Sequence, residues 1–320
     1  MIEPRAVWPY KLRPVVFLRD ARLSQRSLLL LSNTERLLSR WWPSRRLERD
    51  PLDSWQVDGR YAPVTIANWK LTPWMRREVL RRRVAQPLEF TTGRLTIVIP
   101  FRDREPHLTR LLPPLTETLQ RQGIQHQILI VEQAVPGSFN RGRLLNIGIH
   151  YAADHSDYYC LHDVDAIPVH ANYQCPSQPM RLVNAIVRPE GETHRSPHYF
   201  SGAVSVRKDQ VFAANGFSNL YWGWGKEDDD FFFRLLLAGF LCYVDTEGRY
   251  LDLPNPGVTK TSTATKLPQT QQNRKRRSAL VRGCLDPMQD GLNTLKYDVL
   301  ERIEHPQYVK VRVSWPGEGA

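Results

Sequence analysis

Four consecutive carboxylates, Glu227 to Asp230, directly follow a loop in which two tryptophans alternate with two glycines. Four adjacent acids are costly to bury without partners, and an apolar run, Phe231 to Phe240, follows them. The pattern predicts a helix with the acids in its first turn, where negative charge is favoured. Indoles beside carboxylates suit a sugar, which offers an apolar ring face and many hydroxyls. The alternative is an acidic helix cap beside core tryptophans.

A second acidic feature, Asp163-Val-Asp165, follows the apolar run Tyr158 to His162. Two carboxylates one residue apart at the end of a strand can hold a hard divalent cation that also binds phosphate oxygens. Because the same spacing occurs in ordinary turns, its position in the fold has to decide between the two interpretations.

Two segments that combine an aromatic residue with arginine accompany these acids. Arg102 and Arg104 suit a diphosphate, with Phe101 near a base; the alternative is a cluster of surface ion pairs with neighbouring acids. Phe139 and Arg141 repeat the combination after the next apolar run. The repetition favours one shared ligand-binding edge.

Alternating strands and helices must position these residues. The patterns predict strand, helix, strand, helix and strand at Leu95–Pro100, Glu105–Gln122, Gln127–Glu132, Asn140–Asp154 and Tyr158–His162. This order is typical of a βαβαβ half of a mostly parallel sheet in an α/β fold. Ligands of such sheets bind at the carboxyl ends of the strands, so the residues that follow each strand are expected around one crevice. No Gly-x-Gly-x-x-Gly follows the first strand, which disfavours a dinucleotide fold.

Composition divides the chain into two regions. We expect a basic, mainly helical N-terminal region over 1–92 and an α/β domain over 93–320, because much of the net charge of +11 lies in the first part and the strand–helix alternation begins after it. Its predicted elements are helices at Ser27–Trp42 and Pro73–Val84 and a loop at Asp50–Pro63, and residues 254–278 are predicted to form a mobile basic loop. A basic surface can face nucleic acid, an anionic membrane or an acidic partner; no RNA-binding motif or zinc-finger spacing supports nucleic acid.

The sequence shows neither an apolar run long enough for a membrane span nor a signal peptide. We therefore expect a cytoplasmic protein that is peripheral to a membrane through its basic face. Its four cysteines have no metal-ligand spacing and are too few for a disulfide framework.

The chain from about 95 to 313 resembles the β-1,4-galactosyltransferase family, whose members are inverting glycosyltransferases of GT-A fold. Five segments carry the resemblance, in family order: Val98-Ile-Pro-Phe-Arg-Asp-Arg104, Phe139-Asn-Arg-Gly-Arg-Leu-Leu-Asn-Ile-Gly148, His162-Asp-Val-Asp-Ala-Ile-Pro168, Asn215-Gly-Phe-Ser-Asn-Leu-Tyr-Trp-Gly-Trp-Gly-Lys-Glu-Asp-Asp-Asp230 and Asp290-Gly-Leu-Asn-Thr-Leu-Lys-Tyr297. The basic Lys226 before the acids is similar to the xylosylprotein galactosyltransferase branch.

The resemblance implies a role for each matching position. The residues that would bind the donor UDP-sugar are Pro100, Phe101, Arg102, Arg104, Phe139, Arg141, Asp163, Val164, Tyr199 and Trp224. Those that would line the acceptor sugar are Tyr221, Trp222, Gly225, Glu227, Asp228 and Asp229. Asp228 would be the general base, with Glu227 beside it, and Trp224 would sit on a loop that closes over the donor. Tyr199 matches a position where tyrosine accompanies galactose and a smaller residue accompanies N-acetylgalactosamine; the alternative is a core aromatic at a strand edge.

The metal site departs from the family pattern. Asp165 would bind Mn²⁺ or Mg²⁺, but the family's histidine ligand is missing from Gly248-Arg-Tyr-Leu-Asp-Leu-Pro254. Asp252 is the candidate replacement, because a carboxylate also suits these ions. The open alternatives are a metal held by Asp165 and phosphate alone, or lost activity. Cys160 and Cys175 lie near family cysteines that form a disulfide, although in a reducing compartment they are expected to be thiols.

We therefore expect a metal-assisted transferase that moves galactose from UDP-galactose to a hydroxyl of a glycan or glycolipid acceptor, in a β linkage. One alternative keeps the fold and uses UDP-N-acetylgalactosamine or UDP-glucose. Another, suggested by the missing histidine, is a catalytically silent protein that binds glycans or nucleotide sugars. A nucleic-acid-binding protein has only the basic composition in its favour.

Overall fold

The computed structural model describes residues 59–64, 71–82, 88–196, 199–253 and 268–316. The chain divides into two units, Met1–Glu48 and Arg49–Ala320, and every described residue belongs to the second. The helix predicted at Ser27–Trp42 lies outside the described residues.

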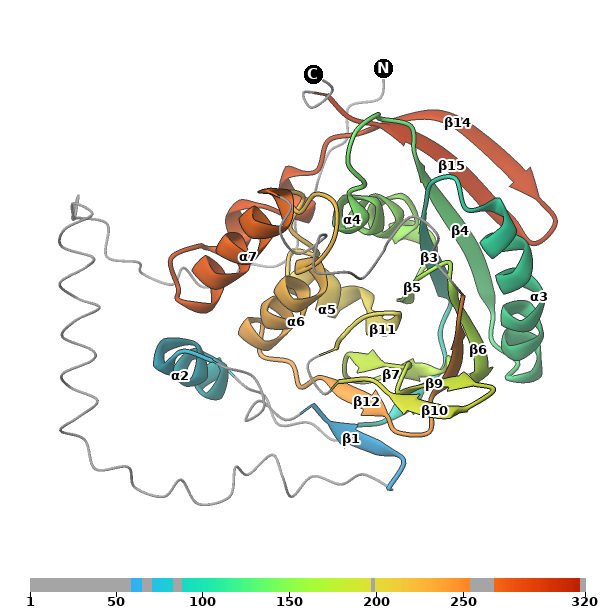
Figure 1. Cartoon of the computed structure of the whole chain (residues 1–320), viewed down its shortest axis with the longest axis horizontal. Coiled ribbons are helices and arrows are strands. Elements are labelled where there is room, and N and C mark those ends of the chain that lie inside the picture. Colours follow the sequence, from blue (N-terminus) through green and yellow to red (C-terminus); the bar gives the residue numbers. More distant parts are fainter. Residues whose placement is uncertain (1–58, 65–70, 83–87, 197–198, 254–267, 317–320) are drawn as a thin grey trace, which may run out of the picture. The chain divides into compact units, whose positions relative to one another are not determined.

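A nine-stranded mixed sheet forms the centre of the unit (Figure 1). Its strands, in spatial order, are β1 (Tyr61–Pro63), β12 (Tyr243–Asp245), β8 (Met180–Arg181), β11 (Ala203–Arg207), β5 (Tyr158–His162), β3 (Leu95–Phe101), β4 (His126–Gln133), β15 (Tyr308–Ser314) and β14 (Asp298–His305). Strand β3 pairs in parallel with both β4 and β5, as predicted. Antiparallel pairs at β1, β11 and β14 make the sheet mixed, whereas the sequence suggested a mostly parallel one.

Helices α3 (Glu105–Arg121) and α4 (Arg141–Tyr151) connect the three central strands and lie on opposite sides of them (Figure 1). Leucines at the spacing of one helical face give α3 its buried stripe: Leu108, Leu111, Leu112, Leu115 and Leu119. Asn140 caps α4, because its side chain accepts a hydrogen bond from the Arg143 N–H. The predicted βαβαβ order is therefore confirmed.

A four-stranded sheet carries Asp252, the candidate metal ligand. Its strands, in spatial order, are β10 (Gly191–His194), β9 (Ala185–Arg188), β13 (Arg249–Asp252) and β6 (Ala166–His170). In the antiparallel pairing of β13 with β6, Asp252 stands opposite Ala166. The register thus brings Asp252 next to the chain that follows Asp165, although 86 positions separate Asp252 from Ala166 along the sequence. A two-stranded sheet joins β2 (Phe90–Thr91) to β7 (Cys175–Pro176).

The remaining helices are α2 (Pro73–Arg82), α5 (Lys208–Ala213), α6 (Glu227–Leu237) and α7 (Pro268–Val281), with 3-10 turns at Ala153–His155, Pro287–Gln289 and Leu292–Thr294. Two sequence predictions were wrong here. The stretch predicted as a mobile loop forms helix α7 from Pro268 onward, while 254–267 lie outside the described residues. The predicted loop at Asp50–Pro63 ends in strand β1, which pairs with β12.

The described part of the predicted N-terminal region packs on the predicted α/β domain. Strand β1 joins the central sheet, and helix α2 lies against α6, where Arg82 Nη1 donates to the Leu237 carbonyl at 3.3 Å. Thr72 Oγ1 donates to the carbonyl of Val281 in α7. The division at residue 92 stays a prediction, but β1 and α2 are parts of the same compact unit as the crevice.

No helix in the described ranges is both long and apolar enough to span a bilayer. All four cysteines are free thiols: Cys160, Cys175 and Cys242 are buried and Cys284 is exposed. Burial raises the pKa of the Cys160 thiol, which disfavours its reactive thiolate form.

Candidate active site

Helix α6 begins at Glu227, so the four acids occupy its first turn, as predicted. Lys226, the residue before the helix, has a left-handed backbone with φ 84°. Asp229 and Asp230 are buried, whereas Glu227 and Asp228 are partly exposed. The adjacent acids therefore meet different surroundings, and their partners differ accordingly.

Asp230 has a structural role. Its carboxylate pairs with the fully buried Arg234 at 2.5 Å and accepts a hydrogen bond from the Tyr221 hydroxyl at 2.9 Å. Asp229 pairs with Lys226 at 2.7 Å and lies 3.9 Å from Arg277 of α7. Tyr221, predicted to contact the acceptor, is buried with its hydroxyl engaged, so in this structure it supports the loop from within.

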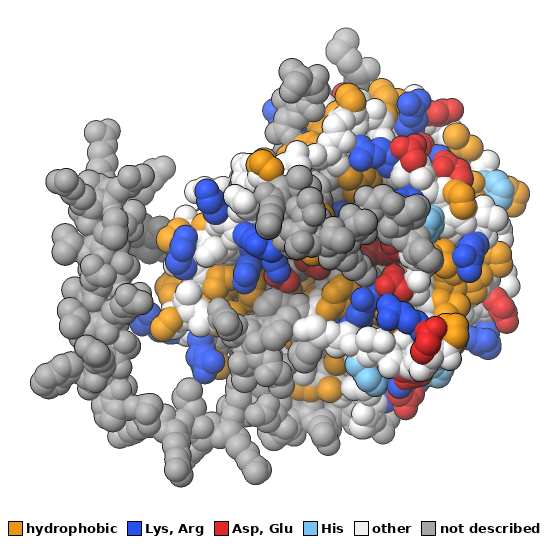
Figure 2. All heavy atoms as spheres, in the orientation of Figure 1, with side chains coloured by type: hydrophobic (Ala, Val, Ile, Leu, Met, Phe, Trp, Pro, Cys, Tyr) orange, Lys and Arg blue, Asp and Glu red, His pale blue; other side chains and the backbone are white. Residues whose placement is uncertain are grey.

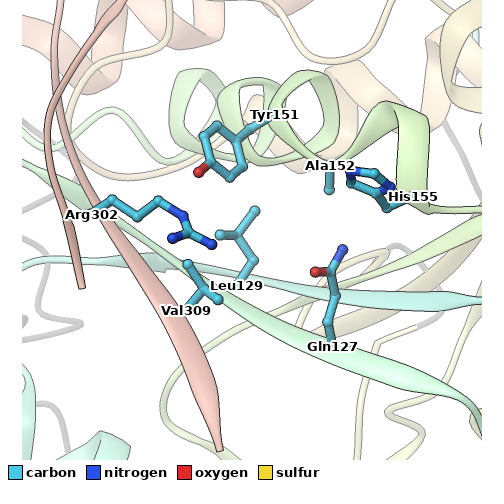
Figure 3. Close-up of a pocket in the computed structure, with 7 residues that line it drawn as sticks. All are labelled: Gln127, Leu129, Tyr151, Ala152, His155, Arg302 and Val309. Atoms are coloured by element: carbon cyan, nitrogen blue, oxygen red, sulfur yellow. The ribbon is translucent and has the colours of Figure 1, made fainter. Parts of the chain in front are cut away.

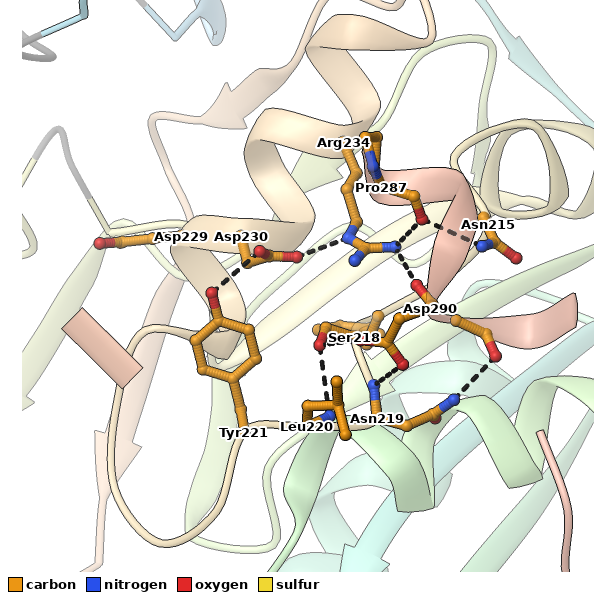
Figure 4. Close-up of polar contacts among 12 residues, drawn as sticks. Asn215, Ser218, Asn219, Leu220, Tyr221, Asp229, Asp230, Arg234, Pro287 and Asp290 are labelled. Atoms are coloured by element: carbon orange, nitrogen blue, oxygen red, sulfur yellow. Dashed lines mark hydrogen bonds and ion pairs between the residues drawn. The ribbon is translucent and has the colours of Figure 1, made fainter. Parts of the chain in front are cut away.

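Arg234 also connects α6 to the segment around Asp290 (Figure 4). Arg234 Nη1 donates to the carbonyls of Pro287 at 2.8 Å and Asp290 at 2.7 Å. The Asp290 carboxylate accepts from the Ser218 hydroxyl and from the Asn219 N–H. The segment around Ser218 and the segment around Asp290 are far apart in the sequence, but they form one hydrogen-bonded unit with α6. This unit adjoins the loop of residues 222–225, which we call the tryptophan loop.

Arg141 connects the two acidic motifs. Its guanidinium lies 2.7 Å from Asp163 Oδ1 and 3.7 Å from Glu227 Oε1. Although burial opposes it, the charges of Asp163, Glu227 and Asp228 raise the pKa of Arg141. The sequence predicted Arg141 and Asp163 as donor-binding residues, and the structure places them together between the ends of β5 and α6.

The first two acids of α6 have raised pKa values. Burial and the Asp228 charge raise the pKa of Glu227 to about 8, while burial and the Asp229 charge raise the pKa of Asp228 to about 6. Glu227 Oε2 is buried and makes no hydrogen bond within the described residues. Of the two acids, Glu227 has the higher pKa and holds a proton more readily, so Asp228 is the better candidate to accept one.

The predicted nucleotide-binding residues follow β3 and β4 at the carboxyl edge of the sheet. The Arg102 guanidinium lies 5.4 Å from the centre of the Phe139 ring and donates to the Gly137 carbonyl at 2.9 Å. Pro100 and Phe101 are buried in β3, and the Lys310 ammonium lies over the Phe101 ring. Arg104 precedes α3, and Val164 packs on the core beside Asp163.

The Asp165 and Asp252 carboxylates interact electrostatically. Burial first, then the charges of Asp163 and Asp252, raises the pKa of Asp165 to about 6. Asp252 itself pairs with Arg195 at 2.9 Å. Within the described ranges no three His, Cys, Asp or Glu side chains form a metal-binding group. Carboxylate oxygens fit Mn²⁺ or Mg²⁺, and such an ion would need further oxygens, for example from a diphosphate.

Tyr199 lies beside Arg195. The Arg195 guanidinium is 4.9 Å from its ring centre. Burial first, then the charge of Asp163, raises the pKa of the Tyr199 hydroxyl. Tyr199 is partly exposed and packs against the hydrophobic core.

Helix α7 holds the tryptophan loop from outside. Asn273 Nδ2 donates to the carbonyls of Trp222 at 2.9 Å and Gly225 at 3.0 Å. Gly223 and Gly225 have left-handed backbones, which glycine adopts without steric cost. Trp224 is 48% exposed, as a residue that covers a ligand should be, whereas the Trp222 ring packs against Trp315.

Sequence reasoning missed Arg195, Asn273 and Arg277. Arg195 lies in no motif, and only the folding of the four-stranded sheet brings it to Asp252. Asn273 and Arg277 were read as part of a mobile loop. A signal for α7 was present: a proline at Pro268, suited to a first helical turn, precedes a run rich in glutamine, arginine and lysine.

A separate pocket of about 190 Å³ lies beside the β14–β15 hairpin (Figure 3). Its lining residues are Gln127, Leu129, Tyr151, Ala152, His155, Arg302 and Val309. None of them belongs to the predicted site, so this hollow is distinct from the crevice.

Comparisons with known proteins agree with this geometry. The family model described as the N-terminal region of glycosyl transferase group 7 matches residues 77–176, and the one described as the N-terminal domain of galactosyltransferase matches 183–250. The chain is 35% identical over 226 residues to β-1,4-galactosyltransferase 1 of Bos taurus and 36% identical over 225 residues to β-1,4-galactosyltransferase 3 of Homo sapiens. These matches cover 69% and 68% of this chain, but only 54% and 55% of those proteins, so the chain spans about half the length of these curated relatives.

Two solved structures are also similar. The catalytic domain of Drosophila β-1,4-galactosyltransferase 7 with xylobiose has 30% identity and a TM-score of 0.59. A variant of that enzyme in complex with manganese, UDP-Gal and xylobiose has 28% identity and a TM-score of 0.60. Each match covers 71% of this chain and 96% of the other. The fold is therefore the α/β GT-A fold, and the chain belongs to the β-1,4-galactosyltransferase family.

Proposed function

We propose that this protein is an inverting galactosyltransferase that moves galactose from UDP-galactose to a hydroxyl of an acceptor sugar and forms a β linkage. The observation that carries the proposal is the assembly of Asp228, Glu227, Arg141 and Asp163 at the carboxyl edge of the central sheet. It joins a carboxylate base to the motif expected to face the donor diphosphate.

In this proposal Asp228 accepts the proton of the acceptor hydroxyl, which attacks the anomeric carbon of galactose as the bond to UDP breaks. Glu227 donates a hydrogen bond to an acceptor oxygen through its unsatisfied carboxyl group. Arg141 pairs with both Asp163 and Glu227 and so holds the two acidic motifs close together. Trp224 covers the donor from the loop that Asn273 holds.

The proposed cofactor is Mn²⁺ or Mg²⁺, since a Drosophila relative was solved with manganese and UDP-Gal. Asp165 and Asp252 would hold the ion, and when bound it would neutralise the charge of the leaving diphosphate. The carboxylate chemistry of the two residues fits this role. Whether Asp252 serves as a ligand is tested by the metal dependence of an Asp252→Ala variant.

Galactose is the proposed donor sugar because Tyr199 occupies the position where, by the family resemblance, a bulky phenol accompanies galactose and a smaller residue accompanies N-acetylgalactosamine. UDP-N-acetylgalactosamine and UDP-glucose are the alternatives. Xylobiose, the sugar bound by the Drosophila relative, supports a sugar hydroxyl as acceptor. A glycan or glycolipid with a terminal sugar is the acceptor class we propose.

The test is UDP release from UDP-galactose, UDP-N-acetylgalactosamine and UDP-glucose with Mn²⁺, with and without simple sugar acceptors. We expect acceptor-stimulated release from UDP-galactose, reduced about 10²- to 10⁴-fold in Asp228→Asn because the general base is lost. Asp298→Asn, on the exposed strand β14, is the matched control and should behave as wild type. Release no greater than that of Asp228→Asn for every donor would instead indicate a silent binding protein.

We also propose that the protein is cytoplasmic and contacts an anionic membrane peripherally, which would bring it to a glycolipid acceptor. Exposed basic residues support this: Arg77 and Arg81 on α2, and Arg274 and Lys275 on α7. In the space-filling view, Lys and Arg side chains gather on the side where these two helices lie (Figure 2). Cosedimentation with anionic but not zwitterionic vesicles, lost at high salt, is the expected result; equal binding to both would contradict it.

A further inference from the structure

Arg195 is a guanidinium in the crevice that no motif predicted. It follows strand β10, and its backbone N–H donates to the Asn184 carbonyl at 2.7 Å. Its Nη2 lies 2.9 Å from Asp252 Oδ2, and the two side chains are 22% and 20% exposed. The pair is therefore held at its base by the sheet and remains accessible from the crevice.

Asp163, Asp165 and Asp252, the carboxylates near the proposed metal site, differ in their ion pairs. Asp163 pairs with Arg141, and Asp252 pairs with Arg195. In the described part of the chain, the ion pairs within 4.0 Å include these two acids but not Asp165. The Arg195 guanidinium thus lies beside Asp252, the residue at the position where the resemblance predicts a histidine ligand. Within the described residues, no three metal-ligating side chains form a group.

Arg195 also retains hydrogen-bonding capacity. A guanidinium has five N–H donors, and Asp252 accepts from Nη2 alone. Arg195 Nε is buried and makes no hydrogen bond within the described residues. A buried, unsatisfied charged donor is costly, and a ligand that brings oxygens to this position would remove the cost.

The contacts of the guanidinium place it beside the acidic motif expected to face the donor. It lies 4.9 Å from the centre of the Tyr199 ring, a favourable cation–π distance. Asp252, the ion-pair partner of Arg195, stands opposite Ala166, which directly follows the Asp163-Val-Asp165 motif. An arginine fixed between an acid and an aromatic ring is preorganised to bind phosphate oxygens with a planar pair of donors.

We propose that Arg195 binds the diphosphate of the UDP-sugar donor, so that nucleotide binding in this protein does not depend wholly on a metal ion. The inference rests on the proposed function, because it takes a nucleoside diphosphate as the ligand. When no ion is bound, Asp252 acts as a positioning residue for the guanidinium.

The experiment is calorimetric titration of the full chain with UDP, once in EDTA and once in Mn²⁺. Wild type is expected to bind UDP in both. In EDTA, Arg195→Ala should bind UDP about 10- to 100-fold more weakly, the effect of losing hydrogen bonds to a charged group. Arg195→Lys, which keeps the charge but not the planar fork, should lie between the two. Arg188→Ala is the matched control, because Arg188 is exposed at the end of neighbouring strand β9.

Thermal melts of each variant show that it is folded before titration. Wild type that binds UDP only with Mn²⁺, or Arg195→Ala that binds as wild type in EDTA, would overturn the inference. An equal loss in Arg188→Ala would do so too, since it would reflect general surface charge. These outcomes are distinct from failure of the proposed function, which would appear as absent UDP-sugar turnover while UDP binding and its dependence on Arg195 are intact.

Discussion

Replacing Arg234 by methionine tests whether the buried network beneath the tryptophan loop holds the site together. Arg234 is 1% exposed and makes three contacts: one with Asp230 and two with the carbonyls of Pro287 and Asp290. Methionine fills similar space but leaves the Asp230 carboxylate, itself 0% exposed, with the Tyr221 hydroxyl as its remaining hydrogen-bond partner among the described residues.

Breaking a buried ion pair by removing one partner costs about 3–5 kcal/mol, because an uncompensated charge remains in the interior. For a domain of this size, each kcal/mol lowers the melting temperature by about 2–4 °C. We therefore expect Arg234→Met to lower the melting temperature by about 6–20 °C. The tryptophan loop loses its support at the same time, so UDP release should fall when measured well below the new melting temperature.

The double variant Asp230→Asn/Arg234→Met removes both charges and should be less destabilised than the sum of the two single variants by about 0.5–3 kcal/mol. Thermal and urea unfolding measure these differences. Arg302→Met is the control, because Arg302 forms an exposed pair with Glu304, and such pairs contribute little. A melting temperature within about 2 °C of wild type for Arg234→Met, or strictly additive effects in the double variant, would refute the reasoning.

Three further results are expected. Gly148→Ala should destabilise the fold by about 1–3 kcal/mol in urea unfolding, because its Cβ would stand 2.3 Å from Val98 Cγ1; a loss below about 0.5 kcal/mol would contradict this. Since the base works only when ionised and burial raises the pKa of Asp228 to about 6, kcat/KM should fall about tenfold per unit below this pH; a flat profile down to pH 5 would argue against Asp228 as the base. Asn273→Ala removes two hydrogen bonds to the loop and should raise the donor KM and expose the chain near Trp224 to proteolysis; unchanged values for both would show that α7 does not hold the loop.

The fold could be predicted from the sequence where periodicity was strong. Strand Leu95–Phe101, helix α4 and strand β5 lie within a few residues of their predicted bounds, because their apolar residues repeat at the spacing of one element. The acids of α6 were placed correctly for the same reason. Helix α7 was missed because it carries few apolar residues, and its contacts to the tryptophan loop are polar.

The sequence by itself determined the family, the central strands and the acidic motifs, since each is written in a short continuous stretch. Only the tertiary structure decided how the acids differ. Asp230 is neutralised by Arg234, Asp229 by Lys226, and Glu227 and Asp228 are left with raised pKa values. Likewise, only sheet pairing brings Arg195 to Asp252, 57 positions away. Pairings between distant segments depend on how elements pack, and local patterns do not contain that information.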